Sequence, residues 1–193
     1  MKVRFLPGGL KLKQTQKFGF VFKNVIFAED VLGRRKKLEL RPVSSTRRED
    51  VEMVMPHHLN TLGTLFGGWL LVWFDLACAK TARIHSGLAC ATVVFDAIEF
   101  YEPVFAGELI IIQSQINRVW KTSCEIGVKV FALASGANER RFVTSTYLTF
   151  VALDENLKPI PMRKVFPETE EEKNCFEEAD IRRKARKERK KPM

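Results

Sequence analysis

A single acidic residue, Asp75, lies within the most apolar stretch of the chain, which predicts a helix over residues 69–85. The residues three, four and seven positions away from it on that helix are small or apolar: Gly68, Leu71, Val72, Cys78, Ala79 and Ala82. A carboxylate on such a stripe loses part of its hydration and becomes a stronger base for any water or polar substrate that reaches it. A buried aspartate that accepts hydrogen bonds from backbone amides explains the pattern equally well, so both roles stay open.

The loop before this helix, residues 60–68, offers a second set of candidate groups. Gly67 and Gly68 precede the helix, where backbone N–H groups have no intrahelical acceptor and the helix dipole favours negative charge. Because these positions lack side chains, a carbonyl oxygen that gains charge during a reaction could approach the amides closely. Asn60 could orient a water molecule or polarise the same carbonyl. Close packing also requires glycines, so the glycine pair alone does not establish this role.

The motifs of several large enzyme classes are absent from the sequence. It contains no GxSxG, GxxxxGK[ST], GxGxxG or HExxH pattern, which argues against serine hydrolases, P-loop enzymes, dinucleotide oxidoreductases and zinc proteases. The three histidines are not spaced as metal ligands, and the four cysteines include no CxxC pair. We therefore expect neither a metal ion nor a redox cofactor, and we expect reduced, buried thiols.

One helix and four strands are expected to position these groups. The strands are predicted from apolar runs: Ala91–Tyr101, Glu108–Val119, Thr122–Ala134 and Arg140–Leu153. In the third strand, Glu125 and Lys129 lie on the face opposite to the apolar side chains. Short connections favour antiparallel neighbours. Because the first half of the helix is apolar nearly all round, other structure must cover it on several sides, and the expected fold class is α+β.

The net charge of +9 comes from the two ends of the chain. Residues 1–43 carry a net charge of +8 and residues 181–193 carry +7, whereas residues 44–180 carry −6. The basic face that nucleic-acid binding needs is therefore not expected on the folded part. No apolar run is long enough to cross a membrane. Residues 1–28 resemble an organelle targeting peptide only weakly, since arginine and serine are scarce there, so we expect a cytoplasmic location.

The segment from Thr169 to Lys191 predicts a second helix. Thr169 and Glu172 have the spacing of a capping box, and acids near the start and bases near the end suit the helix dipole. Two further pairs of opposite charge are spaced four residues apart: Glu178 with Arg182, and Asp180 with Lys184. An exposed charged helix accounts for this pattern, and a phosphate-binding role is the alternative. As an exposed polar segment, residues 181–193 should be dispensable for folding.

The order of the motifs resembles that of the hotdog-fold acyl-CoA thioesterases of the acyl-CoA hydrolase type. The matching segments, within about residues 50–180, are Met55-Pro56, Asn60 to Gly68, Asp75, Val94 to Phe100, Pro103 to Glu108, Thr122-Ser123, Thr149 to Asp154 and Val165 to Glu172. Leu76 and Cys124 depart from the pattern, since many members of the family have Glu and Met there. The resemblance implies a long central helix wrapped by a curved antiparallel sheet. It also implies hydrolysis of fatty acyl-CoA, with coenzyme A as part of the substrate and not as a cofactor.

The resemblance also implies roles for particular residues. Asp75 is expected to be the general base or the nucleophile, with Asn60 as its partner and the amides of Gly67 and Gly68 polarising the carbonyl. Contacts to the acyl-CoA substrate are expected from six residues: Thr64, Phe66, Asp96, Lys121, Thr122 and Ser123. For Asp96, fixing a neighbouring loop is the alternative role. The basic end of the tail is an alternative partner for the coenzyme phosphates.

Helix geometry adds an expectation about assembly. Asp75 lies about 12 Å along the helix axis from Gly67, and groups that act on one thioester carbon must lie within roughly 3–3.5 Å of their targets. A second chain related by a twofold axis would bring Asp75 beside the Asn60 loop of its partner, as the family's composite dimer sites also imply. We therefore expect a homodimer that assembles into a hexamer as a trimer of dimers.

The chain is expected to divide into a basic extension over residues 1–43, a hotdog domain over 44–166 and a charged C-terminal helix over 167–193. Two other functions stay open. A non-catalytic acyl-CoA-binding protein would release no thiol from any acyl-CoA. A protein that binds nucleic acid or membrane surfaces through its basic ends would lose that binding when both ends are removed.

Overall fold

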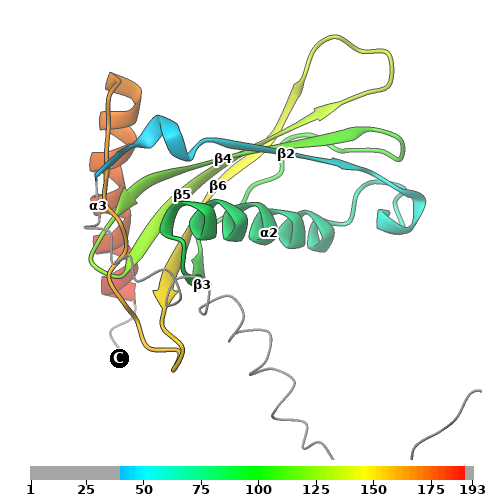
Figure 1. The fold of residues 1–193 in the computed structure, drawn as a ribbon. Coiled ribbons are helices and arrows are strands. Elements are labelled where there is room, and N and C mark those ends of the chain that lie inside the picture. Colours follow the sequence, from blue (N-terminus) through cyan, green and yellow to red (C-terminus); the bar gives the residue numbers. More distant parts are fainter. Residues whose placement is uncertain (1–39, 190–193) are drawn as a thin grey trace, which may run out of the picture. The chain divides into compact units, whose positions relative to one another are not determined.

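The computed structural model describes residues 40–189, and within them one long helix lies across a five-stranded antiparallel sheet (Figure 1). The helix is α2, Gly67–Ser86. The strands are β2 Arg48–Met53, β3 Ala89–Phe95, β4 Leu109–Val119, β5 Ser123–Leu133 and β6 Arg141–Leu153. They lie in the order β2-β4-β5-β6-β3. This arrangement is the expected α+β hotdog fold, in which a curled antiparallel sheet wraps around a long helix.

The core forms between α2 and the inner face of the sheet, because each long strand alternates its side chains between the two faces. In β5 the inward-facing side chains are all buried: Cys124, Ile126, Val128, Val130 and Ala132. They belong to one core with Leu70, Phe74 and Cys78 of α2. The helix ends at Gly87, whose φ of 72° is a left-handed conformation that glycine adopts without strain.

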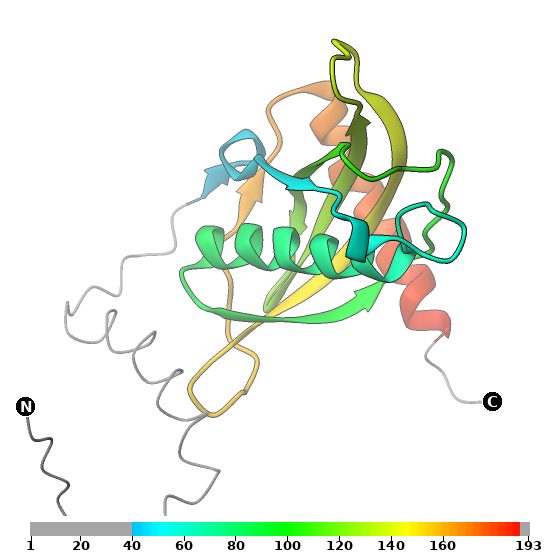
Figure 2. The same cartoon turned by 90° about the vertical axis from the view of Figure 1, so that its right-hand side faces the viewer.

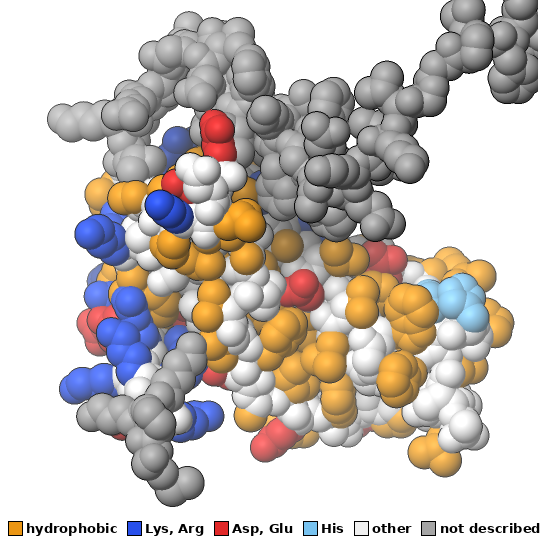
Figure 3. All heavy atoms as spheres, turned by 90° about the horizontal axis from the view of Figure 1, so that it is seen from below, with side chains coloured by type: hydrophobic (Ala, Val, Ile, Leu, Met, Phe, Trp, Pro, Cys, Tyr) orange, Lys and Arg blue, Asp and Glu red, His pale blue; other side chains and the backbone are white. Residues whose placement is uncertain are grey.

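The opposite side of α2 is not covered within the described part of the chain. Leu71, Val72 and Leu76 have exposed fractions of 39%, 46% and 55%. Figure 3 shows hydrophobic side chains spread over the face on which α2 lies. Within residues 40–189, the prediction that other structure covers this helix on several sides is therefore wrong for one side of α2. An apolar helix face of this kind needs another surface against it.

The second helix, α3 (Glu170–Arg189), begins with the predicted capping box. The Glu172 N–H donates to Thr169 Oγ1 at 3.2 Å, and the Thr169 N–H donates to the Glu172 carboxylate at 3.4 Å. The prediction of an exposed helix agrees with most of α3 and fails on the face toward the sheet, where Glu172, Ala179 and Arg186 are buried. Figure 2 shows α3, in orange and red, behind the sheet with α2 in front. The sheet therefore has a helix on each face.

The two charge pairs predicted along α3 have different outcomes. Glu178 and Arg182 form their pair, at 3.0 Å. Asp180 binds the sheet and not the lysine four residues further on: it accepts a hydrogen bond from the Trp120 indole N–H at 2.7 Å and pairs with Arg118 at 2.8 Å. Tertiary contacts thus replace a local pair that spacing alone had suggested.

The described fold starts before residue 44, where the sequence analysis placed the beginning of the domain. Arg41–Pro42 forms β1, which pairs in parallel with β7, Val165–Phe166, and Val43 is fully buried. The rest of the predicted basic extension, including the targeting features of residues 1–28, lies outside the described residues. None of the helices in residues 40–189 is both long enough and apolar enough to cross a membrane.

Besides the short unpredicted strands β1 and β7, two strands of the five-stranded sheet differ from the prediction. β3 ends at Phe95 and not at Tyr101, and it contains a bulge in which Val93 is an extra residue between Thr92 and Val94. β2 was not predicted, and it forms one edge of the five-stranded sheet, with β3 at the other edge. The bulged edge strand β3 lies next to the candidate site.

Candidate active site

The side chain of Asn60 shapes the loop before α2. Its Oδ1 accepts hydrogen bonds from the N–H groups of Leu62 and Thr64, at 2.8 and 3.2 Å, and its Nδ2 donates to Thr64 Oγ1 at 3.0 Å. Gly63, with a φ of 76°, turns the chain between them. One N–H of the Asn60 side-chain amide has no acceptor among the described residues, so it can donate to a substrate oxygen.

The first backbone amides of α2 are also available. No side chain caps the helix at Phe66, and within residues 40–189 the N–H groups of Gly67 and Gly68 have no acceptor. Close packing explains Gly68, because an added Cβ there would lie 2.3 Å from the Phe66 ring. At Gly67 an added Cβ would lie 3.5 Å from the Phe100 ring, which is an ordinary contact. Packing therefore accounts for the second glycine better than for the first.

Asn60, Thr64 and Gly67 line one hollow of about 400 Å³. The other residues that line it are Leu65, Leu70, Phe100, Tyr101, Glu102, Pro103, Val104 and Val143. The structure therefore brings three of the predicted site residues together, with amide donors both from a side chain and from a helix start. Phe66 and Gly68 do not line this hollow.

Asp75 lies on the uncovered side of α2. The residue is half-buried, and its Oδ1 accepts a hydrogen bond from Thr92 Oγ1 of β3 at 2.5 Å. It does not line the Asn60 hollow. Along α2 it is about 12 Å from Gly67. Within one chain the carboxylate and the amide donors do not share a hollow, which agrees with the expectation from helix geometry.

Thr92 is a contact of Asp75 that the sequence analysis missed. A threonine within a strand is ordinarily explained by its β-propensity, so its type and position carried no separate signal. The hydroxyl reaches Asp75 only because β3 pairs with β6 at the edge of the sheet that α2 crosses. By donating to the carboxylate, Thr92 holds Asp75 in one orientation.

Other catalytic groups are scarce around Asp75. Cys78, on the same helix, is fully buried, and burial raises the pKa of its thiol well above the usual range, with the charge of Asp75 adding to the effect. Burial also raises the pKa of Cys124. Because the thiolate is the reactive form, neither thiol is suited to attack a substrate. The described residues contain no group of three or more His, Cys, Asp or Glu side chains that could hold a metal ion.

The turn before β5 meets the basic end of α3. Thr122 and Ser123 line a hollow of about 250 Å³ there. Three basic residues of α3 line it as well: Arg183, Arg186 and Lys187. Lys121 does not line it, so the structure separates this lysine from the two hydroxyls that were predicted to act with it. The turn hydroxyls and the basic tail, which the sequence offered as alternative coenzyme contacts, thus lie at one hollow.

Asp96 is tied to α3. Its Oδ2 accepts a hydrogen bond from Arg186 Nη1 at 2.6 Å, and its backbone N–H donates to the Tyr147 carbonyl at 3.0 Å. Asp96 lines neither the Asn60 hollow nor the hollow beside Thr122. These contacts agree with the alternative role from the sequence, an aspartate that fixes a neighbouring loop.

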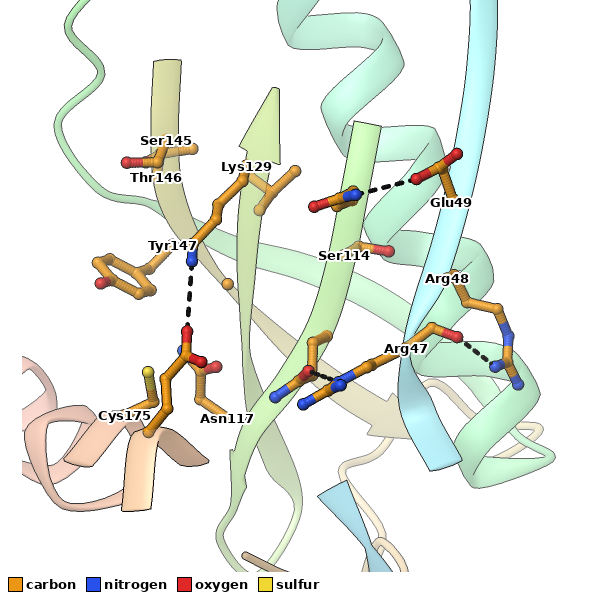
Figure 4. A pocket seen from close by; sticks show the side chains of 15 residues that line it. Arg47, Arg48, Glu49, Ser114, Asn117, Lys129, Ser145, Thr146, Tyr147 and Cys175 are labelled. Carbon is orange, nitrogen blue, oxygen red and sulfur yellow. Dashed lines mark hydrogen bonds and ion pairs between the residues drawn. The ribbon is translucent and has the colours of Figure 1, made fainter. Parts of the chain in front are cut away.

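A larger hollow, of about 540 Å³, lies on the outer face of the sheet beside α3 (Figure 4). None of the predicted site residues lines it. Most of its charged side chains already have partners there: Arg47 with Gln115, Lys129 with Glu171, and Glu49 with Gln113. Its size alone does not make it the reaction site, because it holds neither the carboxylate nor the amide donors described above.

Comparison with known proteins agrees with this fold and site. Residues 62–136 match the Thioesterase superfamily. An acyl-CoA thioester hydrolase of Bacillus subtilis, YkhA, which is itself uncharacterised, is 36% identical over 137 residues, which are 71% of this chain and 80% of YkhA. The chain also matches mouse acyl-CoA thioesterases, and it spans about a quarter of their length.

Two solved structures share the fold over most of the described residues. A hexameric acyl-CoA thioesterase is 35% identical with a TM-score of 0.75, covering 78% of this chain and 97% of that one. An acyl-CoA hydrolase of Staphylococcus aureus, in complex with butyryl coenzyme A, coenzyme A and coenzyme A disulfide, is 29% identical with a TM-score of 0.73, covering 78% and 92%. Alanine variants of that hydrolase at an asparagine, an aspartate and a threonine have also been solved. From the superfamily match, the similarity to YkhA and the shared fold, it follows that this chain belongs to the acyl-CoA thioester hydrolases of the thioesterase superfamily.

Proposed function

We propose that this protein hydrolyses fatty acyl-CoA thioesters at a site built from two copies of the chain. One copy supplies the hollow with Asn60 and the start of α2, and its partner supplies Asp75. The observation that carries the proposal is the position of Asp75: Thr92 holds its carboxylate on the side of α2 that residues 40–189 leave uncovered. A polar group held in place on an apolar surface that a second copy would cover is suited to a shared site.

The relatives support the same residues and an oligomer. The asparagine, aspartate and threonine that were replaced in the Staphylococcus aureus hydrolase follow one another in the same order and with the same spacing as Asn60, Asp75 and Thr92. One of the structural neighbours is a hexamer. We infer that two copies pair about a twofold axis with their α2 helices antiparallel, and that three such dimers form a hexamer.

In the proposed reaction a water molecule attacks the acyl carbon while the Asp75 carboxylate accepts a proton from that water. The charge that develops on the thioester oxygen is stabilised by the Gly67 N–H and the Asn60 side-chain N–H of the other copy. The carbon–sulfur bond then breaks, and coenzyme A leaves as a thiolate that takes up the proton. The products are a free acid and the coenzyme A thiol. Thr92 keeps the carboxylate oriented throughout.

We propose that the hollow beside the turn before β5 holds the coenzyme part of the substrate. Thr122 and Ser123 offer hydroxyl groups, and Arg183 and Lys187 offer cationic groups that suit phosphates. Arg186 is already bound to two carboxylates, so it has less to offer a ligand. A double variant, Arg183→Gln with Lys187→Gln, should raise KM by no more than about tenfold, because exposed charge contacts are weak. The value of kcat should not change.

Thiol release tests the function directly. Purified full-length protein is mixed with acetyl-CoA, butyryl-CoA and palmitoyl-CoA, and free thiol is followed over time. Release from at least one acyl-CoA is expected, and the relative rates give the chain-length preference. Binding of acyl-CoA without any thiol release would contradict the proposal and would indicate a non-catalytic acyl-CoA-binding protein.

Complementation tests the shared site. Asn60→Ala and Asp75→Asn, each expected to be inactive alone, are unfolded and refolded as a mixture. Each mixed dimer then contains one intact site and one site that lacks both residues, so roughly a quarter of the wild-type activity should return after random pairing. Mass spectrometry confirms that mixed dimers have formed. If they form and no activity returns, both residues act within one chain and the shared site is wrong.

A further inference from the structure

We infer that Arg186 of α3 is a positioning residue for the reaction. Through Asp96 it connects the loop between β3 and β4, which lines the Asn60 hollow, to Glu125, which is buried on the outer face of the sheet. This inference rests on the proposed function and extends it to a helix that lies outside the matched superfamily residues 62–136. The contacts that lead to it run from Glu125 through Arg186 to Asp96 and then into the loop.

Glu125 is the first residue in this series of contacts. The sequence placed its side chain on the face of β5 opposite to the core, and there it is fully buried beneath α3. Its Oε1 accepts hydrogen bonds from Arg182 Nη2 at 2.7 Å and Asn117 Nδ2 at 3.2 Å, and its Oε2 accepts one from Arg186 Nη2 at 2.6 Å. A carboxylate without access to water requires such donors. The burial of Glu125 therefore fixes the position of Arg186.

Arg186 holds a second carboxylate with its other terminal nitrogen. Its Nη1 donates to Asp96 Oδ2 at 2.6 Å, and the two side chains are only 9% and 17% exposed. A planar guanidinium can bridge two carboxylates in this way, whereas a lysine ammonium is a single point of charge. Within residues 40–189, no other ion pair of Asp96 exists. Arg186 is thus the link between β5 and the residue that follows β3.

Asp96 begins the connection between β3 and β4, of which residues 97–107 form a loop. Residues 100–104 of this loop line the Asn60 hollow. The Val104 carbonyl also accepts a hydrogen bond from the Leu65 N–H at 2.7 Å, which joins the loop to the segment that carries Asn60. The position of the loop therefore sets one wall of the proposed site.

The far end of the same loop has an arginine of its own. Arg141 pairs with Glu108 at 2.7 Å and donates to the Pro103 carbonyl at 3.2 Å. An arginine thus contacts each end of the loop, and Arg186 is the one that connects it to α3. Residues of β6 also bind the loop: the Thr146 hydroxyl donates to the Ala97 carbonyl at 3.1 Å, and the Tyr101 N–H donates to the Val143 carbonyl at 3.0 Å. Release of Asp96 should loosen the first half of the loop and leave the second half fastened.

The variant Asp96→Ala tests this role without leaving Glu125 unpaired, because Arg182 and Arg186 stay bound to it. We expect faster amide hydrogen exchange in residues 97–101 and a kcat/KM for acyl-CoA that is about 10- to 100-fold lower, since small misplacements of a site wall are costly. The loss should fall mainly on KM, because the reacting groups themselves are unchanged. The far-ultraviolet circular dichroism should match that of the wild type.

Two further variants separate positioning from general stability. Arg186→Gln should show the same loss in kcat/KM as Asp96→Ala, and combining the two should not multiply the losses, because both break one link. Arg118→Gln is the matched control: it removes the ion pair between Arg118 of β4 and Asp180 of α3, and it leaves the contact between Arg186 and Asp96 in place. It should alter neither the loop exchange nor kcat/KM.

The outcomes are distinguishable. Unchanged exchange in residues 97–101 of Asp96→Ala would overturn the inference, and so would faster exchange with unchanged kinetics, or a loss in Arg118→Gln as large as that in Asp96→Ala. If the wild type hydrolyses no acyl-CoA, the proposed function fails, whereas the exchange experiment still decides whether Arg186 holds the loop. Faster exchange together with a higher KM in both Asp96→Ala and Arg186→Gln, with neither change in Arg118→Gln, would support the inference.

Discussion

Deleting residues 181–193 removes both arginines that pair with Glu125. The carboxylate would then keep the Asn117 amide as its one donor among the described residues, and it would lose part of the cover that buries it. Removing one partner of a buried ion pair costs about 3–5 kcal/mol. Little apolar contact is lost with the segment, because Ile181 is 68% exposed. Because water would reach the uncovered carboxylate, we expect destabilisation by no more than about 3–5 kcal/mol, which is a large share of the roughly 5–15 kcal/mol by which a domain is usually stable.

Urea unfolding measures this effect, at one protein concentration because the apparent stability of an oligomer depends on concentration. A chain that ends at Arg189 keeps both arginines and should unfold like the full-length protein. Adding Glu125→Gln to the deletion replaces an unpaired charge by a neutral amide. A neutral amide costs less to leave unsatisfied than a charge does, so part of the lost stability should be recovered. The reasoning is refuted if the deletion leaves the midpoint unchanged, or if Glu125→Gln recovers nothing.

Three further changes test the site and the core. Asp75→Asn should lower kcat/KM for acyl-CoA by roughly 10²–10⁴-fold, the usual contribution of a general base, with an unchanged urea midpoint; an active variant would make Asp75 structural. Thr92→Val removes the donor to Asp75 at constant shape and should lower kcat by about tenfold, less than the loss of the base itself. His85 is buried, with Nε2 2.9 Å from the Arg163 carbonyl oxygen, and burial lowers its pKa. The unfolded chain then binds a proton that the folded chain does not, so stability is full above about pH 6.5 and declines as the pH falls. In His85→Gln the urea midpoint should fall less steeply as the pH is lowered. If the slope of the midpoint against pH is unchanged, other groups cause the decline.

Local patterns were sufficient to predict α2, four strands and the capping box of α3, because each depends on residues close together in the sequence. They also identified Asn60, Gly67 and Asp75 through residue type and spacing. The burial of Glu125 could not be predicted in this way. Its place in the alternation of β5 shows only that it faces away from the core, and the arginine that covers it lies 57 residues further on. A side chain that faces outward from a sheet is buried if a second layer exists, and α3 is that layer.

β2 was missed for a related reason. Along this edge strand the charged residues Arg48, Asp50 and Glu52 are half-buried, whereas Val51 and Met53 are more than half exposed. This pattern is the reverse of the one that signals a strand with an apolar inner face. Lys80 of α2 pairs with Asp50, so the charged face of β2 is satisfied by a residue of the helix. A strand with this reversed pattern can be recognised only when the residue that pairs with its charged face is known.

The bulge in β3 couples the two helices that lie on opposite faces of the sheet. In a regular strand Thr92 and Asp96 would point to the same face, because side chains an even number of residues apart share a face. The extra residue reverses the alternation, so Thr92 reaches Asp75 on α2 while Asp96 reaches Arg186 on α3. The segment from Thr92 to Asp96 therefore contacts both helices through its side chains. A displacement of α3 would reach the Asp75 carboxylate through the backbone between Asp96 and Thr92 and through the side-chain contact that each of these residues makes with a helix.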